Sequence, residues 1–218
     1  MDFTKFVSLL DKKALFFCRS DKLGDPFEGS TSKANIKLPT PTIRTNLPKG
    51  MTLEHLKRFV IINCWSLNEH ESAALWKLYL KGGDGVAVQS TFKRLTQSFN
   101  PNADDYVFIS KIRYIDYKTE LLPEQGFLSQ FWHKRKSFEH EQELRAIIMK
   151  FPRTYVPTAP DIFDGGEYVE VNLEMLIENV YVSPTAQNWF RNIVESIMKK
   201  YNIKKSLIRS DLDDTPVF

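Results

Sequence analysis

The segment with the most chemical potential is Lys134–Arg145, KRKSFEHEQELR, in which charged side chains run directly into an apolar stretch. If residues 141–149 form a strand, side chains two positions apart share a face, so Glu141, Glu143 and Arg145 lie together. A carboxylate that is partly removed from water can stabilise a positive charge that develops during a reaction. We therefore take Glu143, Glu141 and Arg145 as candidate catalytic residues. The competing interpretation is a solvated row of salt bridges at a strand start.

Two further groups of candidate residues lie in a turn and at a strand end. Asp25 and Glu28 lie in the turn GDPFEG, whose glycines and proline give a rigid loop that suits ligand hydroxyls or a divalent cation. An ordinary tight turn explains the same residues. Trp65 and Asn68 leave an apolar strand, 59–65, where an aromatic ring and an amide could form the wall of a pocket.

The remaining candidate binding residues come from four places in the chain. Ser90 and Thr91 end the strand GVAVQST, where their hydroxyls either orient a ligand or cap the next helix. Arg19 ends the apolar run ALFFCR, and Lys136 lies within the basic run KRK. Tyr114 belongs to an alternating stretch that we predict to be one long strand, 106–117.

The sequence lacks the metal and nucleotide signatures that are specific. HEQEL lacks a second histidine four residues after His140, where Leu144 stands, and the four histidines do not fall at ligand spacing. We therefore predict no dedicated metal site. The glycine-rich GGDG matches neither the Walker nor the Rossmann pattern.

Composition excludes several classes of protein. The formal net charge of +3, from 30 basic and 27 acidic residues, is too balanced to indicate a nucleic-acid-binding face. Apolar segments are too short to cross a membrane, and no secretory signal is visible at the start. Cys18 and Cys64 lie in apolar runs, which favours buried, reduced thiols and a cytoplasmic location.

Hydrophobic periodicity predicts a mixed α/β (α+β) fold. We expect a single domain over 1–218, with a mixed central sheet, flanking helices and a βαβ-like unit at 178–209. The helix at 72–81 should direct Trp76, Tyr79 and Leu80 toward the core. Residues 37–50 contain three prolines and no periodicity, which predicts a mobile loop or flap.

Four stretches together resemble a bacterial family, the domain-of-unknown-function 2971 family: LFFCRSDKLGDPFEGS, NCWSLNEHESAALWKLY, GVAVQST and KRKSFEHEQELRAI. They occur in the family's order over about residues 2–150. The resemblance assigns no activity, because the activity of that family is itself unassigned.

A more distant resemblance suggests a reaction. ADP-ribosyltransferases carry a strand with Arg or His, then a Ser-Thr-Ser strand, then a Glu-x-Glu that opens another strand. Gln89-Ser90-Thr91 is similar to the second motif and Glu141-Gln142-Glu143 to the third, while Arg19 is the local substitute for the first. The resemblance implies an NAD-dependent transferase or NAD glycohydrolase, such as a toxin or defence effector, with a protein or nucleic-acid acceptor. Glu143 would stabilise the oxocarbenium-like transition state, Glu141 would orient the acceptor, and Ser90 would support the pocket.

Two other functions stay open. A magnesium-dependent nuclease or phosphodiesterase would use Asp25, Glu28, Glu143 and Lys136 around the metal. The basic residues Lys134 and Arg135 would bind the phosphates. A non-catalytic module would bind a nucleotide or a partner through Trp65, Asn68 and Arg145. A requirement for magnesium would distinguish the nuclease from the transferase. Ligand binding without turnover would identify the non-catalytic module.

Overall fold

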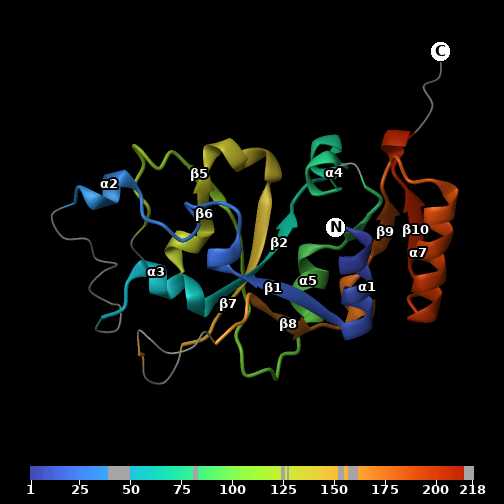
Figure 1. Ribbon diagram of the computed structural model, residues 1–218, viewed down its shortest axis with the longest axis horizontal. Coiled ribbons are helices and arrows are strands. Elements are labelled where there is room, and N and C mark those ends of the chain that lie inside the picture. Colours follow the sequence, from blue (N-terminus) through green and yellow to red (C-terminus); the bar gives the residue numbers. More distant parts are fainter. Residues whose placement is uncertain are drawn as a thin grey trace, which may run out of the picture. The chain divides into compact units, whose positions relative to one another are not determined.

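Figure 1 shows the computed structural model, which describes residues 1–38, 50–80, 83–123, 126, 128–151, 155–156 and 162–213. Its α-helices are α1 (Phe3–Lys12), α2 (Lys33–Ile36), α3 (Leu53–Leu56), α4 (Ala73–Leu80), α5 (Phe92–Ser98), α6 (Leu173–Leu176) and α7 (Asn188–Lys200). Its strands are β1 (Ala14–Arg19), β2 (Val60–Ser66), β3 (Val86–Gln89), β4 (Phe108–Lys111), β5 (Arg113–Ile115), β6 (His133–Arg135), β7 (Glu143–Met149), β8 (Gly166–Glu170), β9 (Asn179–Val182) and β10 (Ser206–Arg209). Helices and sheets both contribute throughout the chain, so the mixed α/β class is confirmed.

The chain folds into two compact units. Unit 1 consists of Met1–Leu15, Asn68–Asn102 and Tyr168–Phe218, and unit 2 of Phe16–Leu67 and Ala103–Glu167. The expectation of a single domain stays a prediction.

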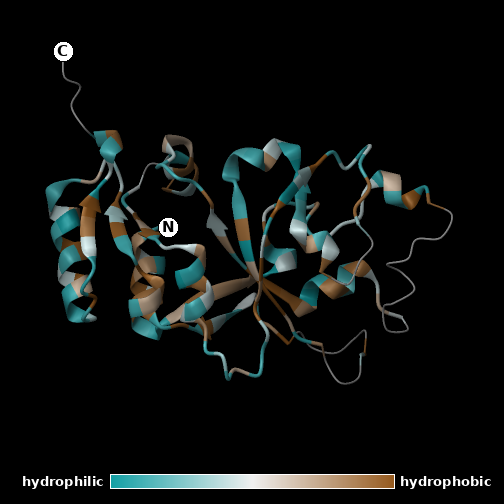
Figure 2. Ribbon diagram, turned by 180° about the vertical axis from the view of Figure 1, so that it is seen from behind, coloured by the Kyte–Doolittle hydropathy of each residue, from teal (hydrophilic) through white to brown (hydrophobic). Residues whose placement is uncertain are grey.

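Unit 1 contains a three-stranded sheet in the order β10-β9-β3. Strands β9 and β10 pair in parallel and are connected through α7, so the predicted βαβ unit is confirmed (Figure 1). Helix α7 buries Phe190, Val194 and Met198, which recur every four residues and form one apolar face. Both hydropathy colours appear along α7 in Figure 2, as this amphipathic pattern requires. Asp2 caps α1 by accepting a hydrogen bond from the Lys5 backbone.

Unit 2 contains most of a five-stranded sheet in the order β4-β7-β2-β1-β8. Strand β7 lies between β4 and β2 and pairs antiparallel with both. The β2–β7 register places Ser66 opposite Glu143 and Cys64 opposite Arg145. Partners in register point to the same face of a sheet, so these four side chains lie on one side of it.

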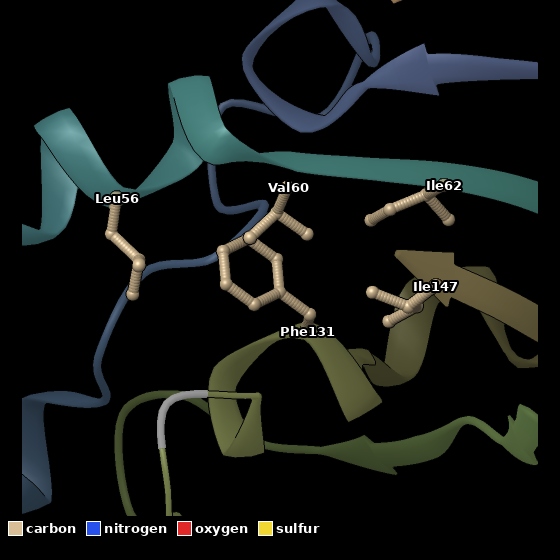
Figure 3. Close-up of a cluster of buried hydrophobic side chains, with 5 residues drawn as sticks. All are labelled: Leu56, Val60, Ile62, Phe131 and Ile147. Carbon is tan, nitrogen blue, oxygen red and sulfur yellow. The ribbon is translucent and has the colours of Figure 1, made fainter. Parts of the chain in front are cut away.

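A hydrophobic cluster covers the same face further along the strands. It consists of Leu56, Val60, Ile62, Phe131 and Ile147, all at most 1% exposed. Figure 3 shows the Phe131 ring between Leu56 and Ile147, with the Val60 side chain next to the ring. Strands β2 and β7 are rich in β-branched residues because such side chains pack well on a pleated surface. The charged residues at the start of β7 therefore lie next to an apolar core on the same face of the sheet.

Some expectations were wrong. The stretch 106–117 is not one strand, because at Ile112 the chain passes from β4, which pairs with β7, to β5, which pairs in parallel with β6. Alternation of apolar residues cannot show such a change of partner. The structure has several sheets rather than one mixed central sheet, and in α4 no residue is buried, Tyr79 being 56% exposed.

Three other expectations concern the surface and the chain's environment. Cys18 is half-buried and Cys64 is exposed, so the prediction of two buried thiols was wrong. Of the predicted 37–50 flap, 39–49 lie outside the described residues. No helix in the part of the chain that the structure describes combines the length and apolar character needed to cross a membrane.

Candidate active site

Arg145 is the centre of a buried ionic cluster in unit 2. It is 1% exposed, and its guanidinium lies between the carboxylates of Glu28 and Glu143. Nε donates to Glu143 at 2.6 Å, and Nη2 donates to Glu28 at 2.8 Å and to Glu143 at 3.2 Å. Nη1 donates to Glu28 and, at 2.9 Å, to the carbonyl of Phe131. All five guanidinium N–H groups are therefore used within the chain.

The GDPFEG turn is what brings Glu28 to Arg145. The Asp25 carboxylate accepts a hydrogen bond from the Phe27 backbone at 3.0 Å, and the Glu28 backbone donates to the Asp25 carbonyl at the same distance. Gly29 has a φ of +63°, and a Cβ there would lie 2.5 Å from the Phe131 ring. Only glycine fits this backbone conformation and this close approach. The turn therefore fixes the Glu28 side chain, which is 3% exposed, beside Arg145.

Glu143 also contacts a second cation, Lys134. The Lys134 ammonium lies 3.2 Å from Glu143 and 2.5 Å from Glu141, so it bridges the two carboxylates. Glu141 is not on β7 as predicted: it ends a 3-10 helix, Lys136–Glu141, and Gln142 turns the chain with a φ of +44°. The Glu-x-Glu pair is nevertheless brought together, through Lys134 rather than through strand alternation.

The electrostatic balance keeps Glu143 ionised. Burial alone would raise its pKa, but Arg145 and Lys134 outweigh burial and hold the pKa below its usual value. Burial likewise opposes the charge on Lys134, yet Glu143 and Glu141 raise its pKa. Glu28 differs, because burial raises the pKa of its carboxyl despite the attraction of Arg145. Of the two carboxylates on Arg145, Glu143 is the one that stays most readily charged.

Two more predicted residues lie beside the cluster. The Tyr114 hydroxyl accepts a hydrogen bond from the Glu143 backbone at 2.8 Å, which fixes the start of β7. Asp25 binds Arg135 at 2.8 Å rather than Arg145. The Arg135 guanidinium also lies over the Phe27 ring at 4.5 Å, a cation–π contact on the outer side of the turn.

Three predicted site residues point elsewhere. Lys136 is exposed and pairs with Glu120 at 2.6 Å, so it is not part of the cluster. Arg19 is opposite Ile61 in β2, five residues or roughly 17 Å along the strand from Ser66, and it binds Asp21 at 2.6 Å. Trp65 alternates with Ser66 and therefore lies on the other sheet face, where its indole N–H donates to Asn63.

The other three predicted residues belong to unit 1. The Ser90 hydroxyl donates to the Leu176 carbonyl at 2.6 Å, and the Thr91 hydroxyl accepts from the Arg94 backbone, which makes Thr91 the N-cap of α5. Asn68 is exposed at the start of the segment 68–102. The structure assigns local roles to Ser90 and Thr91 and does not bring these three residues into the Glu143 cluster.

Sequence reasoning missed residues that complete the cluster. The Phe131 carbonyl and Ser66, which lies opposite Glu143 at the end of β2, were not among the candidates. Lys134 was considered only as a phosphate-binding residue of the nuclease alternative, and not as a partner of Glu143. The Ser66 hydroxyl donates to the Glu141 carbonyl at 2.7 Å and so ties β2 to the turn before β7. The only local signal for Lys134 was its place in a basic run near two carboxylates.

The donor set does not fit a magnesium ion. Among the described residues, no group of three or more His, Cys, Asp or Glu side chains is arranged to hold a metal. A cation already lies between each pair of carboxylates in the cluster: Arg145 between Glu28 and Glu143, and Lys134 between Glu143 and Glu141. The carboxylate–lysine arrangement of the nuclease alternative is therefore not formed.

No family model, curated protein or solved structure matches this chain. The resemblances to the domain-of-unknown-function 2971 family and to ADP-ribosyltransferases therefore remain predictions.

Proposed function

We propose that this chain is an NAD-dependent enzyme of the ADP-ribosyltransferase type, acting as a transferase or an NAD glycohydrolase, with Glu143 as its catalytic carboxylate. The observation that supports this most is the position of the Lys134 ammonium, 3.2 Å from an ionised and buried Glu143. A carboxylate that holds a positive charge in a partly desolvated site can stabilise the cationic ribose of a transition state.

The proposed reaction breaks the glycosidic C–N bond of NAD, and nicotinamide leaves with the electron pair. The oxocarbenium-like ribose then lies against Glu143 in place of the Lys134 ammonium, which stays with Glu141, the nearer of its two partners. Water or an acceptor nucleophile forms the new bond to the ribose carbon. Glu141 orients this nucleophile and takes its proton.

Arg145 has a positioning role in this proposal rather than a direct one. Its five donors are all bound within the chain, which holds the Glu143 carboxylate rigidly but leaves no N–H for a substrate. Ser66, exposed opposite Glu143, marks the side from which a ligand reaches the carboxylate. Ser66 thus takes the place that the sequence interpretation gave to Ser90.

The test is release of nicotinamide from NAD by the intact chain, without added metal and in the presence of a chelator. Glu143→Gln is near-isosteric and should lower the rate by about 10²–10³-fold, the loss typical of one electrostatic stabiliser. Glu139→Gln is the matched control, because Glu139 is an exposed glutamate on the same 3-10 helix. Its rate should equal that of the wild type.

Three results contradict the proposal: no release by the folded wild type, full activity in Glu143→Gln, or loss of activity on chelation. The second candidate is a non-catalytic module that binds a nucleotide or a partner, and it would have to do so without Arg145, because all five N–H groups of that side chain are bound within the chain. That candidate predicts that NAD raises the melting temperature of the wild type while no nicotinamide appears.

A further inference from the structure

Unit 1 contains a surface cavity that is separate from the Glu143 cluster. Its volume is about 470 Å³, within the range of roughly 300–1,000 Å³ common for small-molecule sites. Helices α5 and α6 contribute to its walls, together with the residue before β10. The lining residues are Thr91, Lys93, Arg94, Gln97, Asn172, Glu174, Met175 and Lys205.

The charges around this cavity favour an anion. Lys93, Arg94 and Lys205 supply three positive charges against the single carboxylate of Glu174, so the lining carries a formal charge of +2. Glu174 is bound to Lys205 at 2.5 Å. Within the described part of the chain, the Lys93 ammonium has no ion-pair partner, and its side chain is exposed.

Arg94 is held in place by the chain itself. One guanidinium nitrogen donates to the Met175 carbonyl at 2.9 Å, and Nε lies 3.9 Å from Glu178. These two contacts hold the guanidinium in place and leave the N–H groups of Nη2 to donate. A guanidinium held in place beside an exposed ammonium suits the oxygens of a phosphate group, which accept several charged hydrogen bonds at once.

The remaining lining residues indicate what the rest of the ligand is like. Thr91, Gln97 and Asn172 carry hydroxyl and amide groups, whereas Met175 is the one apolar side chain of the lining. No lining residue is aromatic, so the cavity offers no ring on which a nucleobase would stack. Hydroxyl groups rather than a base fit such a surface.

We propose that the cavity formed by α5, α6 and Lys205 binds a small phosphorylated anion without an aromatic ring, in the size class of a sugar phosphate. The phosphate lies between Lys93 and Arg94, and the polyol contacts Gln97 and Asn172. This site is independent of the reaction proposed at Glu143.

The test is calorimetric titration of the full chain with inorganic pyrophosphate at constant ionic strength. The wild type should bind one equivalent saturably. Lys93→Glu should weaken binding by roughly tenfold or more, since it removes one charge-assisted contact and adds a repulsion. Lys77→Glu is the control: it makes the same charge change at an exposed residue of unit 1 that does not line the cavity.

The proposal is overturned if pyrophosphate does not bind, if binding fails to saturate, or if Lys77→Glu weakens it as much as Lys93→Glu. The last result would show general attraction to a basic surface rather than a site. Glu143→Gln should bind pyrophosphate like the wild type, so failure of this site and failure of the NAD reaction are distinguishable.

Discussion

Replacing Arg145 by methionine should lower the free energy of unfolding by about 3–5 kcal/mol, the usual cost of breaking a buried ion pair from one side. The substitution removes five hydrogen bonds and leaves Glu28 and Glu143 facing each other in the interior. Lys134 still neutralises Glu143, and the raised pKa of Glu28 lets it take up a proton. Both effects place the expected cost toward the lower end of the range.

The measurement is equilibrium unfolding in urea, followed by tryptophan fluorescence, because Trp65 and Trp132 both lie in unit 2. Arg113→Met is the matched control, since Arg113 is exposed on β5, and it should change the unfolding free energy by no more than about 0.5 kcal/mol. Adding Glu28→Gln to Arg145→Met should cost at least about 1 kcal/mol less than the sum of the two single changes. If Arg145→Met costs no more than Arg113→Met, the buried cluster does not stabilise the unit as described.

Two further predictions concern the turn and the pH dependence. Gly29→Ala should destabilise the protein by about 2–4 kcal/mol, because the new Cβ strains a residue with left-handed backbone conformation and meets the Phe131 ring. Gly24→Ala, which has open space around the new Cβ, should be within about 0.5 kcal/mol of the wild type. Equal melting temperatures for the two variants would refute this role of Gly29. The folded pKa of Glu143 lies below its unfolded value of 4.5, so its contribution to stability is present above that value and is lost as the pH falls through the folded pKa. The difference in unfolding free energy between the wild type and Glu143→Gln should therefore shrink below about pH 4.5, and a difference that grows in acid would contradict the assignment.

Part of the candidate site could be predicted from the types of residue in the sequence. Glu143 and Arg145 stood out because charges within an apolar strand must find partners, and the structure supplies those partners. The GDPFEG turn was located by its proline and glycines, which determine local backbone geometry. Local signals of this kind are readable because they depend only on neighbouring residues.

The partners themselves could not be predicted in the same way. Glu28 and Arg145 are 117 residues apart, and no local pattern encodes their contact. The parallel pairing that sets Tyr114 opposite Lys134 depends on a chain that changes sheets at Ile112. A hydroxyl at a strand end looks the same in the sequence whether it caps a helix, donates to a carbonyl or binds a ligand, so the bond from Ser90 to the Leu176 carbonyl could not be predicted.

The proposed role of Glu143 requires a carboxylate that is buried and yet charged. Infrared difference spectroscopy between the wild type and Glu143→Gln, recorded across a pH titration, measures that state directly. We expect the spectrum of an ionised carboxylate at neutral pH, with protonation only below the usual range for glutamate, because Arg145 and Lys134 hold the charge. A protonated carboxyl at neutral pH would contradict both the structure of the cluster and the role proposed for it.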